Sequence, residues 1–127
     1  MATDINKQPE IRVLPMPSDT NASGDIFGGW LMSQVDIAGS IAAHRQVGNR
    51  VVTVAVNEFL FIKPVLVGDL VSIYADIVHI GNTSIRIALD VMAESERGKA
   101  SAQKVAEAVL TYVSLDENKK PKTITRK

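Results

Sequence analysis

The segment DTNASGDIFGGWLMSQVDIAGSIAAHR, residues 19–45, decides the fold of this 127-residue chain. It opens with small and polar residues that favour turns and then continues into the one long helical pattern of the sequence. From Ile26 to Ala43 there is no Lys, Arg or Glu, and Asp36 is the single acid. A helix that is apolar on nearly all sides is normally buried, so the rest of the chain must cover it.

Strand-like segments surround this helix in the sequence. Residues 84–94 show the clearest strand pattern, because apolar side chains alternate with mostly polar ones at a period of two. The full set of predicted strands is 10–14, 51–62, 70–80, 84–94 and 104–115, with an irregularity at Asn57-Glu58. Short connections follow the second, third and fourth of these strands, and we interpret all three as hairpins. The sheet should therefore be largely antiparallel.

One sheet and one long helix form two layers, which predicts a single α+β domain over residues 1–127. Residues 1–9 and 117–127 are expected to be loose tails, and residues 95–99 a polar hairpin loop. The last strand, 104–115, is apolar on both faces. This double apolar face and the all-round apolar helix both suggest that a second subunit covers part of the molecule.

Composition excludes several functional classes. Fourteen basic residues balance fourteen acidic ones, which argues against nucleic acid or an anionic membrane as the main partner. The chain has no cysteine, so disulfides, thiolate metal sites and a cysteine nucleophile are excluded. The first 15 residues lack the apolar core of a signal peptide, and glycines and polar residues make 26–43 a poor membrane span. We expect a cytoplasmic protein.

Asp36 is the first candidate for chemistry, because a carboxylate in an apolar helix carries a desolvation cost unless something holds or uses it. Helical spacing places it in a strip of small residues, which leaves room for another backbone or a narrow ligand channel. The strip comprises Gly29, Ser33, Asp36, Ser40 and Ala43. A structural hydrogen bond explains Asp36 as well as catalysis does, and the sequence leaves these two interpretations even.

The start of the helix offers further candidates. Gly28 and Gly29 would expose backbone N–H groups where the helix dipole favours a developing negative oxygen. For these two glycines a flexible turn or close packing is the simpler explanation. Asn21 either orients a water or makes an Asx-turn, and the turn is favoured by its loop position. No histidine spacing suits a metal, and no Gly-x-Ser-x-Gly elbow is present, so we predict neither a metal site nor a serine esterase.

Residues 19–43, VVTVAV (51–56) and FIKPVLVGDLV (61–71) closely resemble the acyl-CoA thioesterases of the hotdog fold, YciA type. The resemblance covers about residues 11–115. It implies a curved antiparallel sheet wrapped around one long central helix, with the sheet continued across a homodimer. It further implies that dimers assemble into a homohexamer, a trimer of dimers.

The resemblance also implies roles for individual residues. Asp36 would be the catalytic carboxylate, acting either as a general base on water or as a nucleophile. Asn21, from the opposite subunit, would position water or the thioester, and Gly28 and Gly29 would supply the oxyanion contact. CoA would lie along the dimer interface. The residues expected to contact substrate are Lys63 and Arg86, for the phosphates, and Ser33 and Ser40, in the small-residue strip.

The predicted function is hydrolysis of acyl-CoA thioesters to free acid and CoA, without a metal or organic cofactor. One alternative is a binding module that senses acyl-CoA without hydrolysing it, although no DNA-binding segment accompanies the domain. Another is a hotdog hydratase. Such enzymes generally use a histidine-containing pair, and both histidines here, His44 and His79, lie outside residues 19–43.

Overall fold

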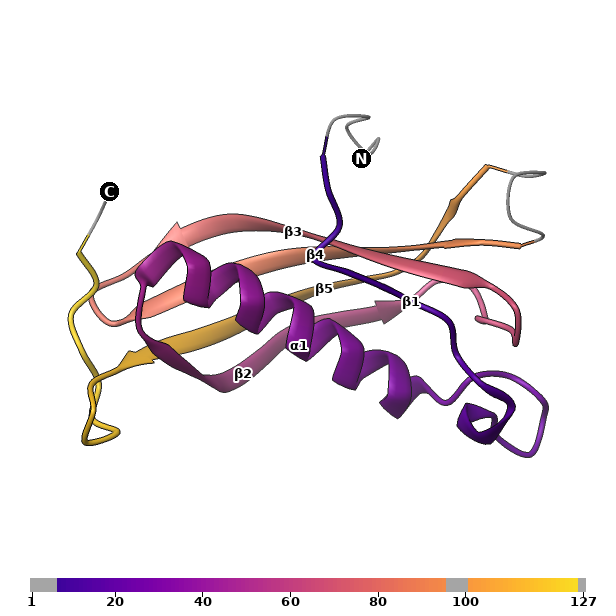
Figure 1. The fold of residues 1–127 in the computed structure, drawn as a ribbon, viewed down its shortest axis with the longest axis horizontal. Coiled ribbons are helices and arrows are strands. Elements are labelled where there is room, and N and C mark those ends of the chain that lie inside the picture. The colour runs from indigo at the N-terminus through magenta and orange to yellow at the C-terminus, as the bar shows by residue number, and fades with distance from the viewer. Residues whose placement is uncertain (1–6, 96–100, 126–127) are drawn as a thin grey trace.

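The computed structural model describes residues 7–95 and 101–125 and shows one long helix lying across a curved sheet (Figure 1). The 95–99 loop prediction falls almost entirely on residues outside these ranges. The elements in chain order are β1 (Ile11–Val13), the short 3-10 helix η1 (Pro17–Asp19), α1 (Gly28–Val47), β2 (Arg50–Phe61), β3 (Leu70–Ile80), β4 (Ser84–Glu94) and β5 (Gln103–Leu115). The predicted helix and all five predicted strands are confirmed, with small shifts at their ends.

Helix α1 begins later than predicted, because Ile26 is held in the preceding loop. The Ile26 N–H donates to the Val65 carbonyl at 2.9 Å, which keeps this residue out of the helix. At the other end Gly48 adopts a left-handed conformation, with φ of 74°, and its N–H donates to the His44 carbonyl at 2.8 Å. Gly48 is therefore a C-terminal glycine cap that ends the helix.

The five strands form one antiparallel sheet in the order β1-β3-β4-β5-β2. The prediction of a hairpin between residues 51–62 and 70–80 is wrong, because β2 pairs with β5 at the far edge and not with β3. The connection must cross roughly 14 Å of sheet, three strand spacings. Hydrogen bonds attach the start of this connection to β5, because the Ile62 and Lys63 N–H groups donate to the Val105 carbonyl. Residues 62–69 are long enough either for a loose hairpin loop or for this crossing, so their length does not distinguish the two.

Edge strand β2 is irregular at two places. Its register with β5 shifts between Val56 and Glu58, which confirms the irregularity predicted at Asn57-Glu58. A second shift lies between Thr53 and Ala55 and was not predicted. Each shift leaves one residue of β2 without a partner on β5, which bends the strand and increases its twist.

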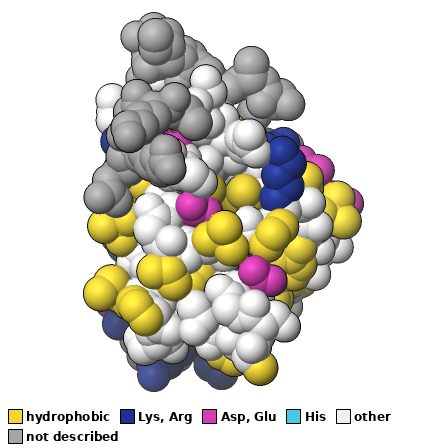
Figure 2. Space-filling model, turned by 90° about the vertical axis from the view of Figure 1, so that its right-hand side faces the viewer, with side chains coloured by type: hydrophobic (Ala, Val, Ile, Leu, Met, Phe, Trp, Pro, Cys, Tyr) yellow, Lys and Arg dark blue, Asp and Glu magenta, His cyan; other side chains and the backbone are white. Residues whose placement is uncertain are grey.

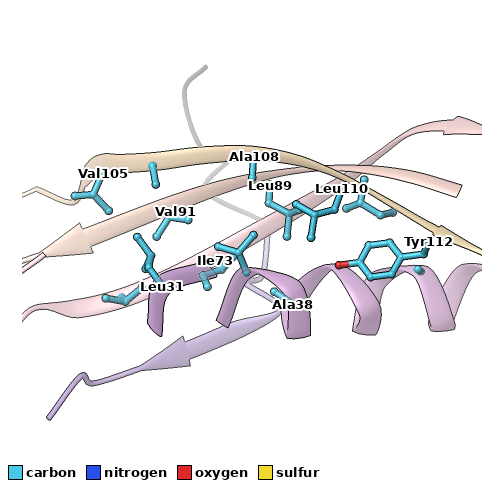
Figure 3. Close-up of a cluster of buried hydrophobic side chains, with 14 of the residues drawn as sticks. Leu31, Ala38, Ile73, Leu89, Val91, Val105, Ala108, Leu110 and Tyr112 are labelled. Carbon is cyan, nitrogen blue, oxygen red and sulfur yellow. The ribbon is translucent and has the colours of Figure 1, made fainter. Parts of the chain in front are cut away.

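The core lies between α1 and the concave face of the sheet (Figure 3). Apolar side chains from α1, β3, β4 and β5 meet there, including Leu31, Ala38, Ile73, Leu89, Val91, Leu110 and Tyr112. The two apolar faces predicted for β5 have different surroundings. On one face Ala106, Ala108 and Leu110 are buried against the helix. On the other face Val109 and Val113 are only half-buried within one protomer.

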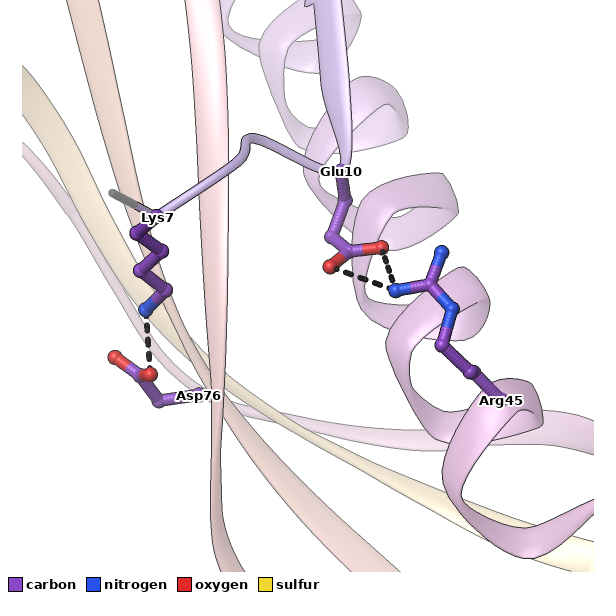
Figure 4. Close-up of polar contacts among 4 residues, drawn as sticks. All are labelled: Lys7, Glu10, Arg45 and Asp76. Carbon is purple, nitrogen blue, oxygen red and sulfur yellow. Dashed lines mark hydrogen bonds and ion pairs between the residues drawn. The ribbon is translucent and has the colours of Figure 1, made fainter. Parts of the chain in front are cut away.

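Both chain ends are better anchored than predicted. Lys7 pairs with Asp76, and Glu10 pairs with Arg45 of α1 at 3.0 Å, which ties the segment before β1 to the sheet and the helix (Figure 4). Near the other end, the Ile124 N–H donates to the Asn82 carbonyl at 2.8 Å and the Ile124 side chain is buried. The described parts of both predicted tails are thus held in place. Within the described residues, no helix is long and apolar enough to cross a membrane.

Candidate active site

Asp36 lies in the middle of α1, with its carboxylate facing β2 and β5. Its Oδ1 accepts a hydrogen bond from the Thr53 hydroxyl at 2.6 Å and lies 3.2 Å from the Tyr112 hydroxyl. Thr53 and Tyr112 are register partners on neighbouring strands, so the sheet presents the two hydroxyls side by side. The carboxylate is therefore held by two donors that come from one rung of the sheet.

Tyr112 is fully buried, and its hydroxyl also donates to the main-chain carbonyl of Asp36 at 2.8 Å. Figure 3 shows the ring between β5 and α1, with the hydroxyl directed toward the helix. Burial of the phenol, together with the adjacent Asp36 carboxylate, raises the pKa of Tyr112 well above its usual range. The group consequently stays protonated and acts as a donor.

A pocket of about 230 Å³ opens beside Asp36. Asp36, Thr53 and Ser33 form its polar side, and the remaining lining is apolar: Met32, Val56, Phe59 and Leu110. Such a pocket suits an apolar group whose polar end meets a carboxylate.

Asn21 lies in the loop before α1 and makes the predicted Asx-turn. Its Oδ1 accepts hydrogen bonds from the N–H groups of Ser23 at 2.9 Å and Asp25 at 3.1 Å. Its side-chain Nδ2 has no acceptor among the described residues and remains available as a donor. Asn21 and Gly28 line a second pocket, of about 400 Å³, together with Phe61 and Lys63.

Gly28 and Gly29 form the start of α1. The first helical hydrogen bond is from the Leu31 N–H to the Phe27 carbonyl at 3.2 Å, so the preceding N–H groups have no acceptor within the helix. A Cβ on Gly28 would lie 3.1 Å from the Phe61 ring, whereas Gly29 borders open space. The donors required for an oxyanion contact are therefore present and accessible.

The carboxylate and these donors do not meet within one protomer. Because an α-helix rises 1.5 Å per residue, Gly29 and Asp36 are about 10 Å apart along the axis. Asp36 lines one pocket, and Asn21 and Gly28 line the other. A single carbonyl group cannot contact both sets of residues in one chain.

The four predicted substrate contacts lie in different places. Ser33 borders the Asp36 pocket, and its hydroxyl donates to the Trp30 carbonyl at 2.8 Å. Ser40 donates to the Ile37 carbonyl and lines a separate groove with His44 and Arg50. Lys63 borders the Asn21 pocket and donates to Gln103 at 2.8 Å. Arg86 is exposed on β4, between Ile85 and Ile87 of the core, and so projects from the sheet face opposite the helix.

Sequence reasoning missed Thr53, Tyr112 and Gly39 as parts of this site. Tyr112 belongs to the strand 104–115, whose apolar pattern gives no sign of a role in the site, although a buried tyrosine hydroxyl needs a partner. Gly39 lies one helical turn after Asp36, and a Cβ there would lie 2.2 Å from the Tyr112 hydroxyl. No group of three or more potential metal ligands occurs in 7–95 and 101–125.

Comparison with known proteins identifies the family of the chain. The family model of the thioesterase superfamily matches residues 23–100. The chain belongs to the thioesterase superfamily. The acyl-CoA thioester hydrolase YciA of Escherichia coli K12 is 47% identical over 116 residues, which cover 90% of this chain and 88% of the E. coli protein.

Solved structures of this superfamily share the fold. A hexameric hotdog fold thioesterase of Campylobacter jejuni, 42% identical, superposes with a TM-score of 0.87 over 93% of this chain and 90% of that one. An acyl-CoA hydrolase of Staphylococcus aureus, in complex with butyryl coenzyme A and coenzyme A, is 28% identical. Its TM-score is 0.85, over 91% of this chain and 70% of that one. The predicted hotdog fold is thus confirmed.

Proposed function

We propose that this chain hydrolyses acyl-CoA thioesters to a free carboxylic acid and CoA, with Asp36 as the catalytic carboxylate. The observation that carries the proposal is the Asp36 carboxylate at the wall of an apolar pocket, held by the Thr53 and Tyr112 hydroxyls. Membership of the thioesterase superfamily supplies the reaction class.

In the general-base route, Asp36 accepts a proton from water as the water oxygen adds to the thioester carbonyl carbon; the C–S bond then breaks, and the proton passes to the leaving CoA thiolate. In the nucleophilic route, an Asp36 oxygen adds to the carbonyl carbon, the C–S bond breaks to give an anhydride and the CoA thiolate, and water then hydrolyses the anhydride to restore Asp36. The proton that this water releases balances the charge of the CoA thiolate formed earlier. The acyl chain occupies the apolar side of the Asp36 pocket.

The carbonyl oxygen becomes negative when water adds, and backbone N–H groups of Gly28 and Gly29 would stabilise it. Because these donors lie about 10 Å from Asp36 of the same chain, we propose that they come from a partner subunit. Asn21 accompanies them, and its Nδ2 is the group that orients water or the thioester. Lys63 borders the same pocket and is retained as a phosphate contact, whereas Arg86 reaches CoA only if another copy approaches the outer sheet face.

Strand β2 is the proposed dimer contact. It is one of the two edge strands of the sheet, and several of its apolar side chains are exposed, namely Val52, Val54, Val56, Leu60 and Phe61. An unpaired apolar edge strand is a template for pairing with another chain. Antiparallel pairing about a twofold axis brings the Phe61 end of one strand to the Arg50 end of the other. The partner's Asn21 pocket then approaches this chain's helix, and we propose that dimers assemble further into a homohexamer.

A hydrolysis screen tests the proposal. Purified protein is incubated with acyl-CoAs from acetyl to palmitoyl, and the released thiol is measured. We expect turnover by the wild type and a loss of at least about 100-fold in Asp36→Asn, which keeps the size of the side chain and removes its basicity. Asp76→Asn, on the opposite sheet face beside Lys7, is the matched control and should keep wild-type turnover.

The same screen separates the alternatives. Tight acyl-CoA binding by the wild type without thiol release would favour a binding module, and water addition to an enoyl-CoA would favour a hydratase. Turnover by Asp36→Asn at the wild-type rate would remove Asp36 from the mechanism. The proposal includes no metal or organic cofactor, so dialysis against a chelator should leave turnover unchanged. A cytoplasmic location stays a prediction, to be checked by cell fractionation.

A further inference from the structure

We propose that Tyr112 is a positioning residue for Asp36, and that the absence of a side chain at Gly39 gives the Tyr112 hydroxyl the space to reach it. The inference rests on the proposed hydrolysis at Asp36 and extends it to a residue on the opposite side of the core. It concerns how the carboxylate is oriented, since the Tyr112 hydroxyl contacts Asp36, whereas Tyr112 itself does not line the Asp36 pocket.

The Tyr112 hydroxyl contacts both the main chain and the side chain of a single residue. It donates to the Asp36 carbonyl at 2.8 Å and lies 3.2 Å from the Asp36 Oδ1. A carbonyl oxygen has two lone pairs, so it accepts this bond in addition to its helical one. A donor shared between O and Oδ1 restricts rotation about the Asp36 Cα–Cβ bond and fixes where the carboxylate points.

The two carboxylate oxygens are consequently different. Oδ1 receives both hydroxyls, from Thr53 and Tyr112, whereas Oδ2 has no hydrogen-bond donor among the described residues. Oδ2 therefore carries the lone pairs available to water or the thioester. The hydroxyl pair sets which oxygen reacts.

Gly39 makes this contact possible. An added Cβ would lie 2.2 Å from the Tyr112 hydroxyl and 2.9 Å from its ring carbon Cζ, both too close for any side chain. The Tyr112 ring is fully buried, so a side chain at position 39 would force the hydroxyl away from Asp36. Gly39 and Tyr112 thus form a matched pair that delivers a donor from β5 to the middle of α1.

Because burial and the Asp36 carboxylate raise the pKa of Tyr112, its hydroxyl remains protonated over the working pH range. It donates a hydrogen bond to Asp36 and does not exchange protons with substrate. Its contribution is geometric and should appear in kcat, whereas substrate affinity should be little changed.

Tyr112→Phe tests this, because it removes the hydroxyl and keeps the ring. We expect kcat to fall about tenfold with KM within about twofold of wild type, the size expected for one lost bond to a charged group. Tyr74→Phe is the matched control. Tyr74 is the other tyrosine of the chain, lies next to Ile73 of the core on β3, and projects to the opposite sheet face. Thermal melting of each variant checks the fold.

Gly39→Ala gives an independent test, because its methyl group displaces the Tyr112 hydroxyl without altering Tyr112. Both single variants remove the same contact, that of the Tyr112 hydroxyl with Asp36. The double variant should therefore be no slower than Gly39→Ala alone. A double variant whose loss equals the product of the two single losses would contradict the shared role. So would a folded Tyr112→Phe with wild-type kcat. If wild-type protein hydrolyses no acyl-CoA, the proposed function fails; if it does and Tyr112→Phe matches it, this inference alone fails.

Discussion

Thr53 and Tyr112 hold the same carboxylate oxygen, but the fold depends on them to different degrees. Tyr112 fills the core, and its ring packs between β5 and α1. Thr53 is exposed on the edge strand β2, and its hydroxyl donates a 2.6 Å hydrogen bond to Asp36. The effect of Thr53 on activity can therefore be separated from its effect on stability.

Thr53→Val keeps the β-branched shape and removes the donor. We expect kcat to fall about tenfold, because a hydrogen bond to a charged group is lost, while exposure of the site keeps the change in unfolding free energy near ±0.5 kcal/mol. Steady-state kinetics and thermal melts measure the two effects. Thr111→Val is the control, since the Thr111 hydroxyl makes an equally short 2.6 Å bond, to Asn57. A variant of Thr53 with wild-type kcat would show that Tyr112 alone suffices.

The sequence identified Asp36 as a candidate but not the two hydroxyl groups that bind its carboxylate. Asp36 stands out because it is the one charged residue in 26–43. Thr53 and Tyr112 do not stand out, since threonine and tyrosine are ordinary strand residues. Their role depends on the pairing of β2 with β5, which sequence reasoning had assigned otherwise. Asn21 made the Asx-turn that its loop position indicated and still presents an unused amide.

Helix α1 ends at the glycine cap of Gly48, and the contribution of this cap to stability can be measured. Gly48 has φ of 74°, a conformation that costs about 1 kcal/mol or more for a residue with a Cβ. Gly48→Ala should lower the melting temperature by about 3–5 °C in this size range. Gly29→Ala is the stability control, because its Cβ would meet no heavy atom and alanine favours the helix. An unchanged melting temperature for Gly48→Ala would mean that the cap contributes little.

Periodicity located the helix and the four longer strands well, above all β4 with its alternating apolar face. The same reasoning failed for the β2–β3 connection. Sequence spacing reports how far a connection can reach, and it does not report which strand lies next to which. Here β5, the last strand, inserts between β4 and β2, a long-range pairing that leaves no local trace in residues 62–69.

The surface of the protomer includes many exposed large hydrophobic side chains. The β2 edge continues into the end of the molecule that contains the start of α1, where hydrophobic side chains gather (Figure 2). These include Leu14, Met16, Phe27, Ile62, Leu66 and Val67. Exposed apolar side chains that gather on one face mark interaction sites, and Ile62 of this set also lines the pocket of Asn21 and Gly28. Assembly and completion of the active site are therefore the same event in the proposed dimer.

A shared site makes a prediction that a site within one chain does not. Asn21→Asp keeps the Oδ1 acceptor of the Asx-turn and removes the Nδ2 donor, and Asp36→Asn removes the carboxylate. Each variant alone should be nearly inactive. In a mixed dimer, however, one site receives Asp36 from the first variant and Asn21 from the second, and is intact.

Coexpression of the two variants with different tags, followed by random pairing, should restore about a quarter of wild-type turnover. Tandem purification through both tags isolates mixed assemblies, whose specific activity should exceed that of the random mixture. Coexpression of two differently tagged Asp36→Asn chains is the control and should stay inactive. If mixed assemblies are also inactive, Asn21 and Asp36 act from the same chain, and a rearrangement of the loop before α1 must bring Asn21 to Asp36.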